Sequence, residues 1–456
     1  MKTPIQQPRN QKPLVKTPIP GPQSQALRRR EDEHLAPGLQ NFALLAGIAV
    51  SEARGSAVTD VDGNILIDLI GGIGVNALGH SHPQYARAIQ EQVERSSVGS
   101  FTSEARVKLF ERLATHRPSP SLNRVQLYSS GAEAVESALR LAKSRTGKYE
   151  FVSFSGGFHG KTMGVLSLMG SEFKNGFGPM VAGCHIAPYA DCYRCPLKLR
   201  YPSCGLACVE ATREQVKKNS SGEIAAFLIE PMQGTAGNVI PPKEFLPLIK
   251  SLAREFDALL IVDEMITGFG RTGRYWGCEH SGVEADIVTV GKQLGGGFPI
   301  SGIITTDEIA RSKPWSNPSG SSSSYGGNPL AAAAAGACLA IIDDEALVDN
   351  SRQVGGHLLR RMADWVERYP FVGYVRGTGL FVGIELVCDK PTKKPLAKSV
   401  CERIFHECLQ RGLLTMTYTN QVRIQPALSI DEGTVDAALD ILTEVFDLID
   451  REGCWK

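Results

Sequence analysis

The chain has 456 residues and a formal net charge of +1, with 42% apolar and 21% charged residues. This length and composition predict a folded protein of two or three domains with a large hydrophobic core. The charge balance argues against nucleic acid as the main partner, because the chain has no excess of positive charge to attract phosphates. The sequence contains no stretch of about 18 apolar residues, so it predicts no membrane span.

The first residues, MKTPIQQPRNQKPLVKTPIPGP (1–22), are rich in Pro, Gln and Lys and lack the apolar segment of a secretory signal. They offer too little apolar surface to offset the entropy lost on ordering, so we expect a flexible arm. Without an export signal, the eleven cysteines are expected in a reducing cytoplasm.

After the arm, residues 55–72 alternate apolar and polar side chains around Asp62-Gly63, which predicts a β-hairpin. From about residue 100, short apolar segments alternate with segments of helical spacing, such as residues 131–143 and 243–256. The predicted strands are RVQLY (124–128), EFVSF (150–154), AAFLI (225–229), ALLIV (258–262) and DIVTV (286–290). Continuous apolar strands alternating with helices indicate a mostly parallel sheet covered on both faces.

From about residue 340 the pattern changes to amphipathic helices around strands at 374–387 and 421–428, which predicts an α+β domain. SIDE at 429–432 is typical of a capping box that opens the last helix. The predicted division comprises a flexible arm (1–22), an N-terminal segment of the small domain (23–75), a large domain (76–340) and the C-terminal small domain (341–456).

Ligands of open parallel sheets bind beyond the carboxyl ends of the strands. In this chain those ends carry SSGA (129–132), SGGFHG (155–160), Glu230, the acid pair Asp263-Glu264, and Gly291-Lys292. The acid pair has four possible uses: a metal ligand, a general base, a charge partner for a cofactor, or a helix cap. No His/Cys pair stands at metal-binding spacing among these residues.

Two glycine-containing turns are candidates for anion binding. SSGAEA joins a strand to a helix, whose free N–H groups and dipole favour a phosphate, although a plain tight turn explains the sequence equally well. SGGFHGKT (155–162) approaches the phosphate loop of ATPases but has Ser155 where that motif requires Gly. We favour a different use, in which Phe158 presents a flat face to an aromatic ligand; the alternative is core packing.

Lys292 ends the apolar strand DIVTVGK. Burying an ammonium group is costly, and burial lowers a lysine pKa, which makes the neutral amine available as a Schiff-base nucleophile. The alternative is a surface lysine in a loop. Lys292 is expected at the same edge of the sheet as Asp263, an anion-binding turn and an aromatic side chain. An aldehyde cofactor with a phosphate, a pyridinium nitrogen and a flat ring needs these four features.

Together these segments resemble the class III pyridoxal-phosphate aminotransferases. The resemblance is carried first by DEM (263–265) with GFGRTG behind it, and by GKQLGGGFPISG around Lys292. Further segments in family order are IDLIGGIGVNALGHSHP (67–83), SSGAEAVESALRLAK (129–143), GGFHGKT (156–162), IEPMQG (229–234), SYGGNPLAAAA (324–334) and VRGTGLFVGIEL (375–386). The resemblance covers about residues 40–450. It implies fold type I: a large domain with a mostly parallel seven-stranded sheet covered by helices, plus a small α+β domain from both termini.

The resemblance implies pyridoxal 5'-phosphate as the cofactor, with Lys292 as its Schiff-base lysine and Asp263 as the partner of its pyridine nitrogen. Glu264 would serve the local structure. The implied cofactor-binding residues are Ser130, Gly131, Ala132, Phe158, His159, Glu230, Asp263, Met265, Lys292 and Ser324. Ser324 would reach the phosphate from the neighbouring subunit of a homodimer. Arg423 would receive a substrate carboxylate, and Ile73 would also contact the substrate.

The implied activity is ping-pong transfer of nitrogen from an ω-amino acid or primary amine to a keto acid, pyruvate or 2-oxoglutarate. Ile266 stands where many members have Gln, as in the amine and ω-amino-acid:pyruvate branch. Thr235 stands where members acting on 4-aminobutyrate or ornithine have Glu. A racemase or epimerase and a decarboxylating aminotransferase share every cofactor residue and remain alternatives. A nucleotide- or metal-binding regulatory module is the alternative from another class.

CYRCPLKLRYPSCGLAC carries four cysteines in the spacing C-x₂-C-x₈-C-x₃-C. Four thiolates could close a zinc or iron–sulfur site, although the middle spacer is shorter than in common zinc modules. Because the family chemistry needs no metal, we expect none, and interpret Cys192, Cys195, Cys204 and Cys208 as structural cysteines of a loop over the active-site mouth. Basic side chains of this loop could instead bind a charged substrate tail; they are Arg194, Lys198 and Arg200.

Overall fold

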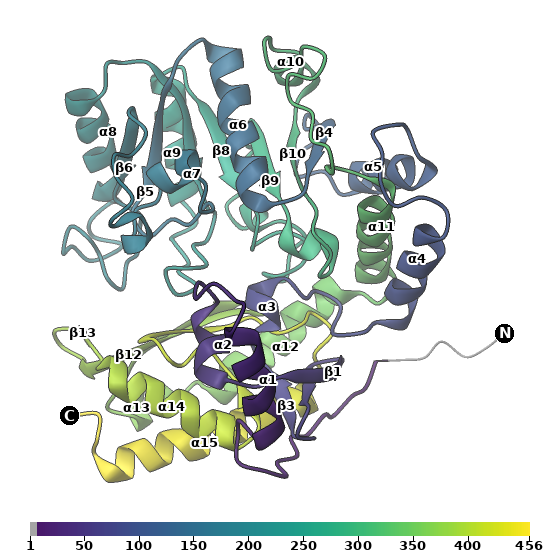
Figure 1. The fold of residues 1–456 in the computed structure, drawn as a ribbon. Helices are drawn as coiled ribbons and strands as arrows, with labels where there is room; N and C mark the ends of the chain where they lie inside the picture. The colour runs from purple at the N-terminus through teal and green to yellow at the C-terminus, as the bar shows by residue number, and fades with distance from the viewer. Residues whose placement is uncertain (1–6) are drawn as a thin grey trace. The chain divides into compact units, whose positions relative to one another are not determined.

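The computed structural model describes residues 7–456, which form two compact units (Figure 1). The large unit is Arg87–Asp344, against 76–340 expected from the sequence. The small unit reaches Ala86 and resumes at Glu345, so it is built from both ends of the chain.

The large unit alternates strands and helices along most of its length. Its strands are β4 (Arg124–Tyr128), β5 (Glu150–Phe154), β6 (Cys184–Ala187), β7 (Ile224–Ile229), β8 (Leu259–Asp263), β9 (Ile287–Val290) and β10 (Ser301–Thr305). Its helices are α5 (Glu104–Thr115), α6 (Gly131–Thr146), α7 (Met163–Ser167), α8 (Ala207–Asn219), α9 (Phe245–Glu255), α10 (Asp307–Ala310) and α11 (Pro329–Asp344), with short 3-10 turns η1 (Glu172–Lys174), η2 (Gly277–His280) and η3 (Lys292–Gly295). The five strands predicted from apolar runs are all present, each within one residue of its predicted bounds.

These strands form one seven-stranded sheet in the order β4-β10-β9-β8-β7-β5-β6. Neighbours from β9 to β6 run parallel, whereas β10 is antiparallel to both β4 and β9. The predicted mostly parallel sheet is therefore confirmed. The carboxyl ends of β5, β7, β8 and β9 meet at one edge, together with the start of β10, and this edge carries the candidate site.

The strands are apolar on both faces because helices cover both, as Figure 1 shows for α6 in front and α9 behind. Helix α6 supplies fully buried residues such as Val135, Ala138 and Leu141, which pack with Leu228 and Ile261 of the central strands. Burying side chains of this size stabilises the fold by roughly 1.5–3 kcal/mol each. The site edge therefore rests on a rigid core.

The small unit contains two short sheets and the flanking helices. Its N-terminal elements are α1 (Pro22–Asp32), α2 (Asn41–Ala46), β1 (Val50–Arg54), β2 (Ala57–Asp60), β3 (Ile65–Asp68), α3 (Gly71–Gly74) and α4 (Pro83–Val93), which continues into the large unit. Its C-terminal elements are α12 (Leu347–Arg361), α13 (Trp365–Arg368), β11 (Val372–Thr378), β12 (Phe381–Asp389), β13 (Lys394–Pro395), α14 (Lys398–Gln410), β14 (Leu413–Leu414), β15 (Gln421–Ile424) and α15 (Glu432–Glu452). The predicted hairpin is confirmed: β2 pairs antiparallel with β3, and Gly63 supplies the left-handed turn residue at φ +83°.

The N-terminal segment is not the flexible arm that its composition suggested, as far as residues 7–22 are concerned; residues 1–6 lie outside the described part. Leu14 exchanges two backbone hydrogen bonds with Ile65, at 2.9 and 2.8 Å. The Asn64 carboxamide accepts the N–H groups of Lys16 and Thr17. Ile19 is 3% exposed and joins the core of the small unit. Backbone hydrogen bonds, which composition does not reveal, order this segment.

The last helix also begins differently from the prediction. The N-cap of α15 is Asp431, whose carboxylate accepts the Thr434 N–H at 2.9 Å. Ser429, the predicted capping serine, instead donates to the Leu78 carbonyl at 2.8 Å. An aspartate nearer the helix outcompetes the serine because its charged oxygen bonds the amide and complements the helix dipole.

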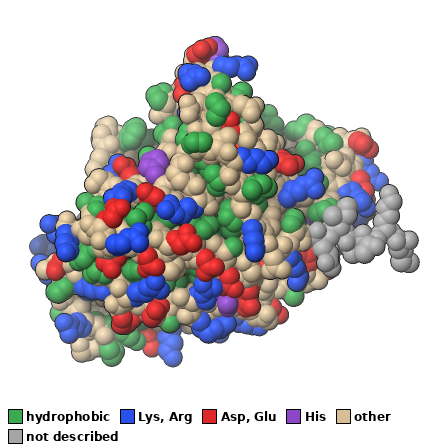
Figure 2. Space-filling view, turned by 90° about the horizontal axis from the view of Figure 1, so that it is seen from below, with side chains coloured by type: hydrophobic (Ala, Val, Ile, Leu, Met, Phe, Trp, Pro, Cys, Tyr) green, Lys and Arg blue, Asp and Glu red, His purple; other side chains and the backbone are tan. Residues whose placement is uncertain are grey.

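Two surface properties complete the description. On the face seen in Figure 2, Lys and Arg side chains are interspersed with Asp and Glu. Within residues 7–456, no helix is both long and apolar enough to cross a membrane.

Candidate active site

Asp263 is the last residue of β8 and is buried at the site edge of the sheet. Its Oδ2 atom lies 2.7 Å from Nδ1 of His159, and its Oδ1 atom accepts the Thr289 hydroxyl at 3.0 Å and the Met265 N–H at 3.1 Å. Burial alone would raise the pKa of Asp263, but His159, then Lys292, together with the Met265 amide, lower it below its usual range. The site therefore contains a buried carboxylate that is held ionised.

Glu264 follows directly but has a different function. Its Oε2 accepts the Gly277 N–H at 2.9 Å and its Oε1 the Cys278 N–H at 2.7 Å, and it also accepts the Thr267 hydroxyl. Burial raises the pKa of Glu264, and these hydrogen bonds oppose that effect. The structure thus confirms that Glu264 serves the local structure and that the two acids do not act as a pair.

Lys292 follows β9 and opens the 3-10 turn η3. Its backbone is left-handed, with φ +43°, and its side chain is half-buried. A non-glycine residue in this region costs of order 1–3 kcal/mol and occurs mostly where the surrounding structure fixes it for function. Lys292 is close enough to Asp263 for its charge to lower the pKa of that carboxyl group. The strand end therefore holds an amine near the buried carboxylate.

The start of α6 is the turn that we expect to bind an anion. Ser130 is the N-cap, and its hydroxyl accepts the Glu133 N–H at 3.2 Å. The backbone N–H groups of Gly131 and Ala132 lie in the first turn of this 16-residue helix. No carbonyl of the helix is available to them there, and the helix dipole is positive at this end. Ser301 of β10 fixes this turn by donating to the Ser130 carbonyl at 2.6 Å.

Met265 links this turn to the lysine. A Cβ atom added to Gly131 would lie 3.1 Å from the Met265 sulfur, and one added to Gly291 would lie 2.6 Å from it. Both glycines therefore lie close to the flexible Met265 side chain, which would have to shift if either glycine became alanine. They bring the anion-binding turn, Met265 and the residue before Lys292 into one cluster.

Phe158 supplies the aromatic side chain, and its ring is half-buried. The ring meets Phe173 edge to face, with centroids 5.5 Å apart and planes at 76°. Its backbone N–H donates to Oε1 of Glu230 at 2.9 Å, and Oε2 of Glu230 accepts the Gly234 N–H at 3.0 Å. Burial raises the pKa of Glu230. Glu230 thus hydrogen-bonds both the backbone of Phe158 and the loop that follows β7.

Ile266 adds an apolar wall to the same loop. It is 4% exposed, and a Cβ on Gly234 would lie 3.1 Å from two of its carbon atoms. Its carbonyl accepts the side-chain N–H of Gln293 at 2.9 Å. The residue that replaces the family's Gln is therefore firmly packed.

The large unit thus fits pyridoxal phosphate by three independent observations. An ionised carboxylate is buried at Asp263, which suits a protonated pyridine nitrogen. A helix start with glycine at the point of close approach suits a phosphate. A strained lysine stands beside both, where the cofactor's aldehyde requires an amine.

Three expected site residues lie apart from this cluster in the chain. Ser324 is exposed in the loop before α11. Arg423 lies on β15 of the small unit, where its side chain hydrogen-bonds Tyr418. Ile73 also belongs to the small unit, where it packs against the core. Residues 71–74 all have φ between +55° and +70°, which is costly for a β-branched side chain such as Ile73.

Two residues that position the site were not predicted from the sequence. Thr289 is paired with Asp263 in the β8–β9 register, so its hydroxyl faces the carboxylate. Ser301 begins β10 and fixes the turn at Ser130. Thr289 could have been noticed as a single polar residue inside the apolar strand DIVTV. Ser301 could not be found in this way, because it acts on Ser130 across an antiparallel strand pair.

Known proteins are similar to this chain over most of its length. The leucine/methionine racemase of Thermococcus litoralis is 35% identical over 379 residues, 81% of this chain and 83% of that protein. The 5-aminovalerate aminotransferase of Pseudomonas putida is 35% identical over 384 residues, 82% of this chain and 87% of that protein. The structure of an amine transaminase from an uncultivated Pseudomonas species matches with a TM-score of 0.85 at 30% identity, covering 91% of this chain and 98% of the other.

The family model for class III aminotransferases matches residues 41–446, almost the whole length. That range contains every residue of the cluster around Lys292 and Asp263. The chain therefore belongs to the class III aminotransferase family and is a pyridoxal-phosphate-dependent enzyme.

Proposed function

We propose that this aminotransferase takes nitrogen from an ω-amino acid or a primary amine and gives it to a keto acid, pyruvate or 2-oxoglutarate. The observation that carries the proposal is the ionised, fully buried Asp263 beside the strained Lys292. The donor class is supported by the packed Ile266 and by two relatives, one acting on 5-aminovalerate and one named as an amine transaminase.

Bound pyridoxal phosphate supplies an aldehyde and a ring that accepts electrons from the substrate α-carbon. Lys292 provides the amine that holds the cofactor and afterwards moves a proton at the reacting carbon. Asp263 keeps a negative charge at the pyridine nitrogen. His159 and Thr289 orient that carboxylate, which a buried ionised group requires.

The remaining cofactor contacts divide between the phosphate and the ring. The N–H groups of Gly131 and Ala132, next to the Ser130 cap, bind the phosphate, and Phe158 and Met265 pack on the ring. Glu230 fixes the backbone that carries Phe158. Each role suits a side chain or N–H group that the site edge of the sheet presents.

We further propose a cytoplasmic homodimer with shared active sites. Ser324 is exposed and the adjacent Tyr325 is 66% exposed, as expected for a segment that completes the partner's phosphate site. The cysteines of residues 7–456 are all free thiols, which suits a reducing compartment.

Substrate recognition is proposed to involve the small unit. The Arg423 guanidinium would bind a carboxylate by a bidentate contact, and Ile73 would offer an apolar surface to the substrate chain. Thr235 cannot form with an arginine the ion pair that a glutamate would form, so we propose no gating of Arg423 by residue 235.

Racemisation is the second candidate function, because a leucine/methionine racemase is among the relatives at 35% identity. A racemase needs the same lysine and carboxylate but returns the proton to the carbon from which it came. The two functions differ in one measurable product: only transamination converts a keto acid into an amino acid.

The test is a donor screen with pyruvate and 2-oxoglutarate run side by side. Donors should include 5-aminovalerate, 4-aminobutyrate, a primary amine, L-leucine and L-methionine. We expect alanine to form from pyruvate with the ω-amino acids or the amine. Racemisation of L-leucine or L-methionine without a keto acid, and no amino transfer, would overturn the proposal.

Lys292→Ala and Lys218→Ala form a matched pair for this screen. Lys218 is an exposed lysine of α8, remote in sequence from the site. Lys292→Ala should lose essentially all transfer together with the visible absorption of covalently bound cofactor, and Lys218→Ala should keep both. Full activity in Lys292→Ala would reject the assigned lysine.

A further inference from the structure

The segment between β6 and α8, residues 188–206, has no helix or strand of its own. Loops of this length without regular structure are uncommon in compact domains unless they serve a function or are held by additional bonds. This loop contains Cys192, Cys195 and Cys204, and Cys208 follows in the first turn of α8. The cofactor site uses none of these thiols.

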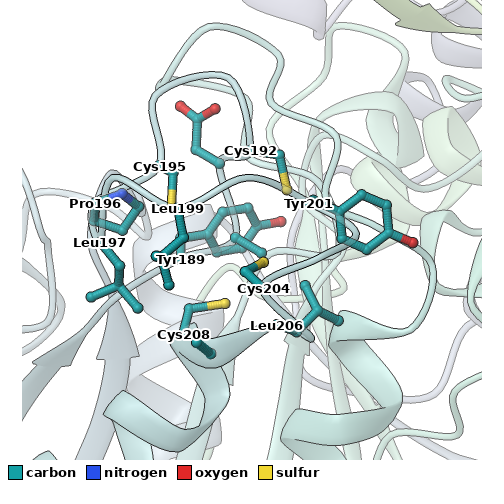
Figure 3. Close-up of a pocket in the computed structure, with 13 residues that line it drawn as sticks. Tyr189, Cys192, Cys195, Pro196, Leu197, Leu199, Tyr201, Cys204, Leu206 and Cys208 are labelled. Carbon is teal, nitrogen blue, oxygen red and sulfur yellow. The ribbon is translucent and has the colours of Figure 1, made fainter.

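The four cysteines line a single pocket (Figure 3). The pocket, with its open mouth, encloses about 310 Å³. Its other walls are mainly apolar and aromatic, formed by Tyr189, Ala190, Asp191, Pro196, Leu197, Leu199, Tyr201, Leu206 and Ala207. Residues separated by up to 16 positions in the sequence thus bring all their sulfur atoms to one cavity.

The thiols of this pocket are free, and none forms a disulfide. Cys208 is buried and the other three are half-buried. The pocket therefore holds four thiols that no covalent bond occupies.

We propose that Cys192, Cys195, Cys204 and Cys208 bind one structural zinc ion. Zinc takes four thiolates in tetrahedral geometry, and its ligands come typically in pairs spaced C-x₂₋₄-C. The pairs Cys192/Cys195 and Cys204/Cys208 have two and three intervening residues and satisfy this rule. Zinc binds these side chains as thiolates, because a coordinating thiol is deprotonated outright. This replaces the expectation of purely structural cysteines.

Binding requires the thiols to turn toward one another. Among residues 7–456, no three His, Cys, Asp or Glu side chains already stand close enough to hold a metal ion. A cysteine side chain redirects its sulfur by a single rotation about χ1 between staggered positions. The loop backbone between the two pairs has turns but no ladder bonds that would resist adjustment.

The step is balanced in atoms and charge. Four thiols bind one Zn²⁺ and release four protons, so the site gains two negative charges. The loop carries Arg194, Lys198 and Arg200, whose positive charges offset this excess. Zinc would then cross-link the start of the loop to the start of α8, independently of the aminotransferase reaction.

The experiment measures zinc in the purified full-length holoenzyme by elemental analysis, after incubation with Zn²⁺ and removal of the excess. We expect about one zinc per chain. Native mass spectrometry of the wild-type chain should show, at equal ion charge, the added mass of one zinc less two protons. Four of the eleven thiols should become unreactive toward a thiol reagent and should react again after chelation.

The variant Cys192→Ser/Cys204→Ser should lower the zinc content at least tenfold. Cys184→Ser is the matched control, since Cys184 is a half-buried free thiol in the adjacent strand β6 but does not line the pocket. It should keep the zinc. Bound cofactor absorption checks that each variant is folded, and the wild-type mass measurement requires no variant.

Three results would overturn the proposal. One is a chain that stays free of metal after incubation with Zn²⁺. The second is iron with acid-labile sulfide in place of zinc. The third is a pair of disulfides among these cysteines in protein purified without oxygen.

Discussion

Nδ1 of His159 lies 2.7 Å from Oδ2 of Asp263, with both side chains 1% exposed. The first follows β5 and the second ends β8, so two non-adjacent strands of the sheet meet in one hydrogen bond. A buried carboxylate stays ionised only if it is paired and hydrogen-bonded. His159 is therefore a positioning residue, which determines the charge that Asp263 presents.

The two residues should respond unequally to substitution. Asp263→Asn removes the charge, and we expect kcat to fall by about 100-fold or more. His159→Asn keeps a hydrogen-bonding side chain but removes an imidazole, and we expect a loss of about 10-fold. The pKa of Asp263 should rise in His159→Asn, so the visible spectrum of bound cofactor should change with pH where the wild type is constant. An unchanged spectrum would contradict the positioning role.

Gly291→Ala tests the close approach beside Lys292. The new Cβ would lie 2.6 Å from the Met265 sulfur and 3.3 Å from Cβ of Ser301, so Met265 must move. Overpacking of this kind costs about 1–3 kcal/mol. We expect cofactor affinity to fall about 10-fold, measured by equilibrium titration. Gly336→Ala, in α11 with nothing within 4 Å, should leave the affinity unchanged.

Tyr128→Phe tests how the loop before Ser324 is anchored. The Tyr128 hydroxyl is buried between the Ser137 and Ser321 hydroxyls and also donates to the Ser321 carbonyl at 3.2 Å. Removing it leaves two buried serine hydroxyls short of a partner, which costs about 1–3 kcal/mol. Urea unfolding should show this loss. An undiminished midpoint would mean that water replaces the hydroxyl.

Ser324→Ala tests the shared phosphate site. If this hydroxyl binds the phosphate in the partner subunit, the cofactor dissociation constant should rise about 5- to 10-fold for the loss of one hydrogen bond to a charged group. Ser322→Ala, also exposed in the same loop, is the control and should bind as the wild type does. Mixed dimers carrying one Ser324→Ala and one Lys292→Ala chain would assign the contact to the neighbouring subunit.

Glu150→Gln should lower stability in a pH-dependent way. Burial alone would raise the pKa of Glu150, but hydrogen bonds from Ser220, Ser221 and His185 outweigh it and lower the pKa from 4.5 to about 2. A lowered folded-state pKa gives stability that is full above about pH 4.5 and is lost as the pH falls toward 2. We expect Glu150→Gln to unfold about 1–2 kcal/mol more easily at neutral pH.

The pH series distinguishes this cause from simple loss of packing. Urea unfolding of wild type and Glu150→Gln at several pH values from neutral to about 3 should show the difference shrinking with acid. A difference that stays constant over this range would mean that the ionisation of Glu150 contributes nothing.

The central strands could be predicted from the sequence because each is a short apolar run that must be buried on both faces. The same is true of α6, whose apolar residues recur at helical spacing, and of the Asp62-Gly63 turn. Asp263 and Lys292 could be found because charged residues at the ends of buried strands are uncommon. In each case local sequence and burial point to the same structure.

The remaining features depend on contacts between distant segments. Residues 7–22 look unstructured by composition, yet Asn64 and Ile65 bind their backbone. Ser429 and Asp431 are both plausible caps, and the local sequence does not show that Ser429 instead bonds the distant Leu78 carbonyl. Likewise, Ser301 acts on Ser130 through a strand pairing that local sequence does not specify.

The antiparallel direction of β10 limits how this enzyme can change. The chain leaves β9 at the cofactor edge, passes through Lys292, and re-enters the sheet at the same edge, where Gly302 pairs with Val290. Both ends of this connection are fixed, so an added or deleted residue would displace the reactive amine. Residues between Cys195 and Cys204, by contrast, can vary in number without altering the spacing within either cysteine pair. Length changes should therefore be tolerated in that loop, while the connection around Lys292 changes by substitution alone.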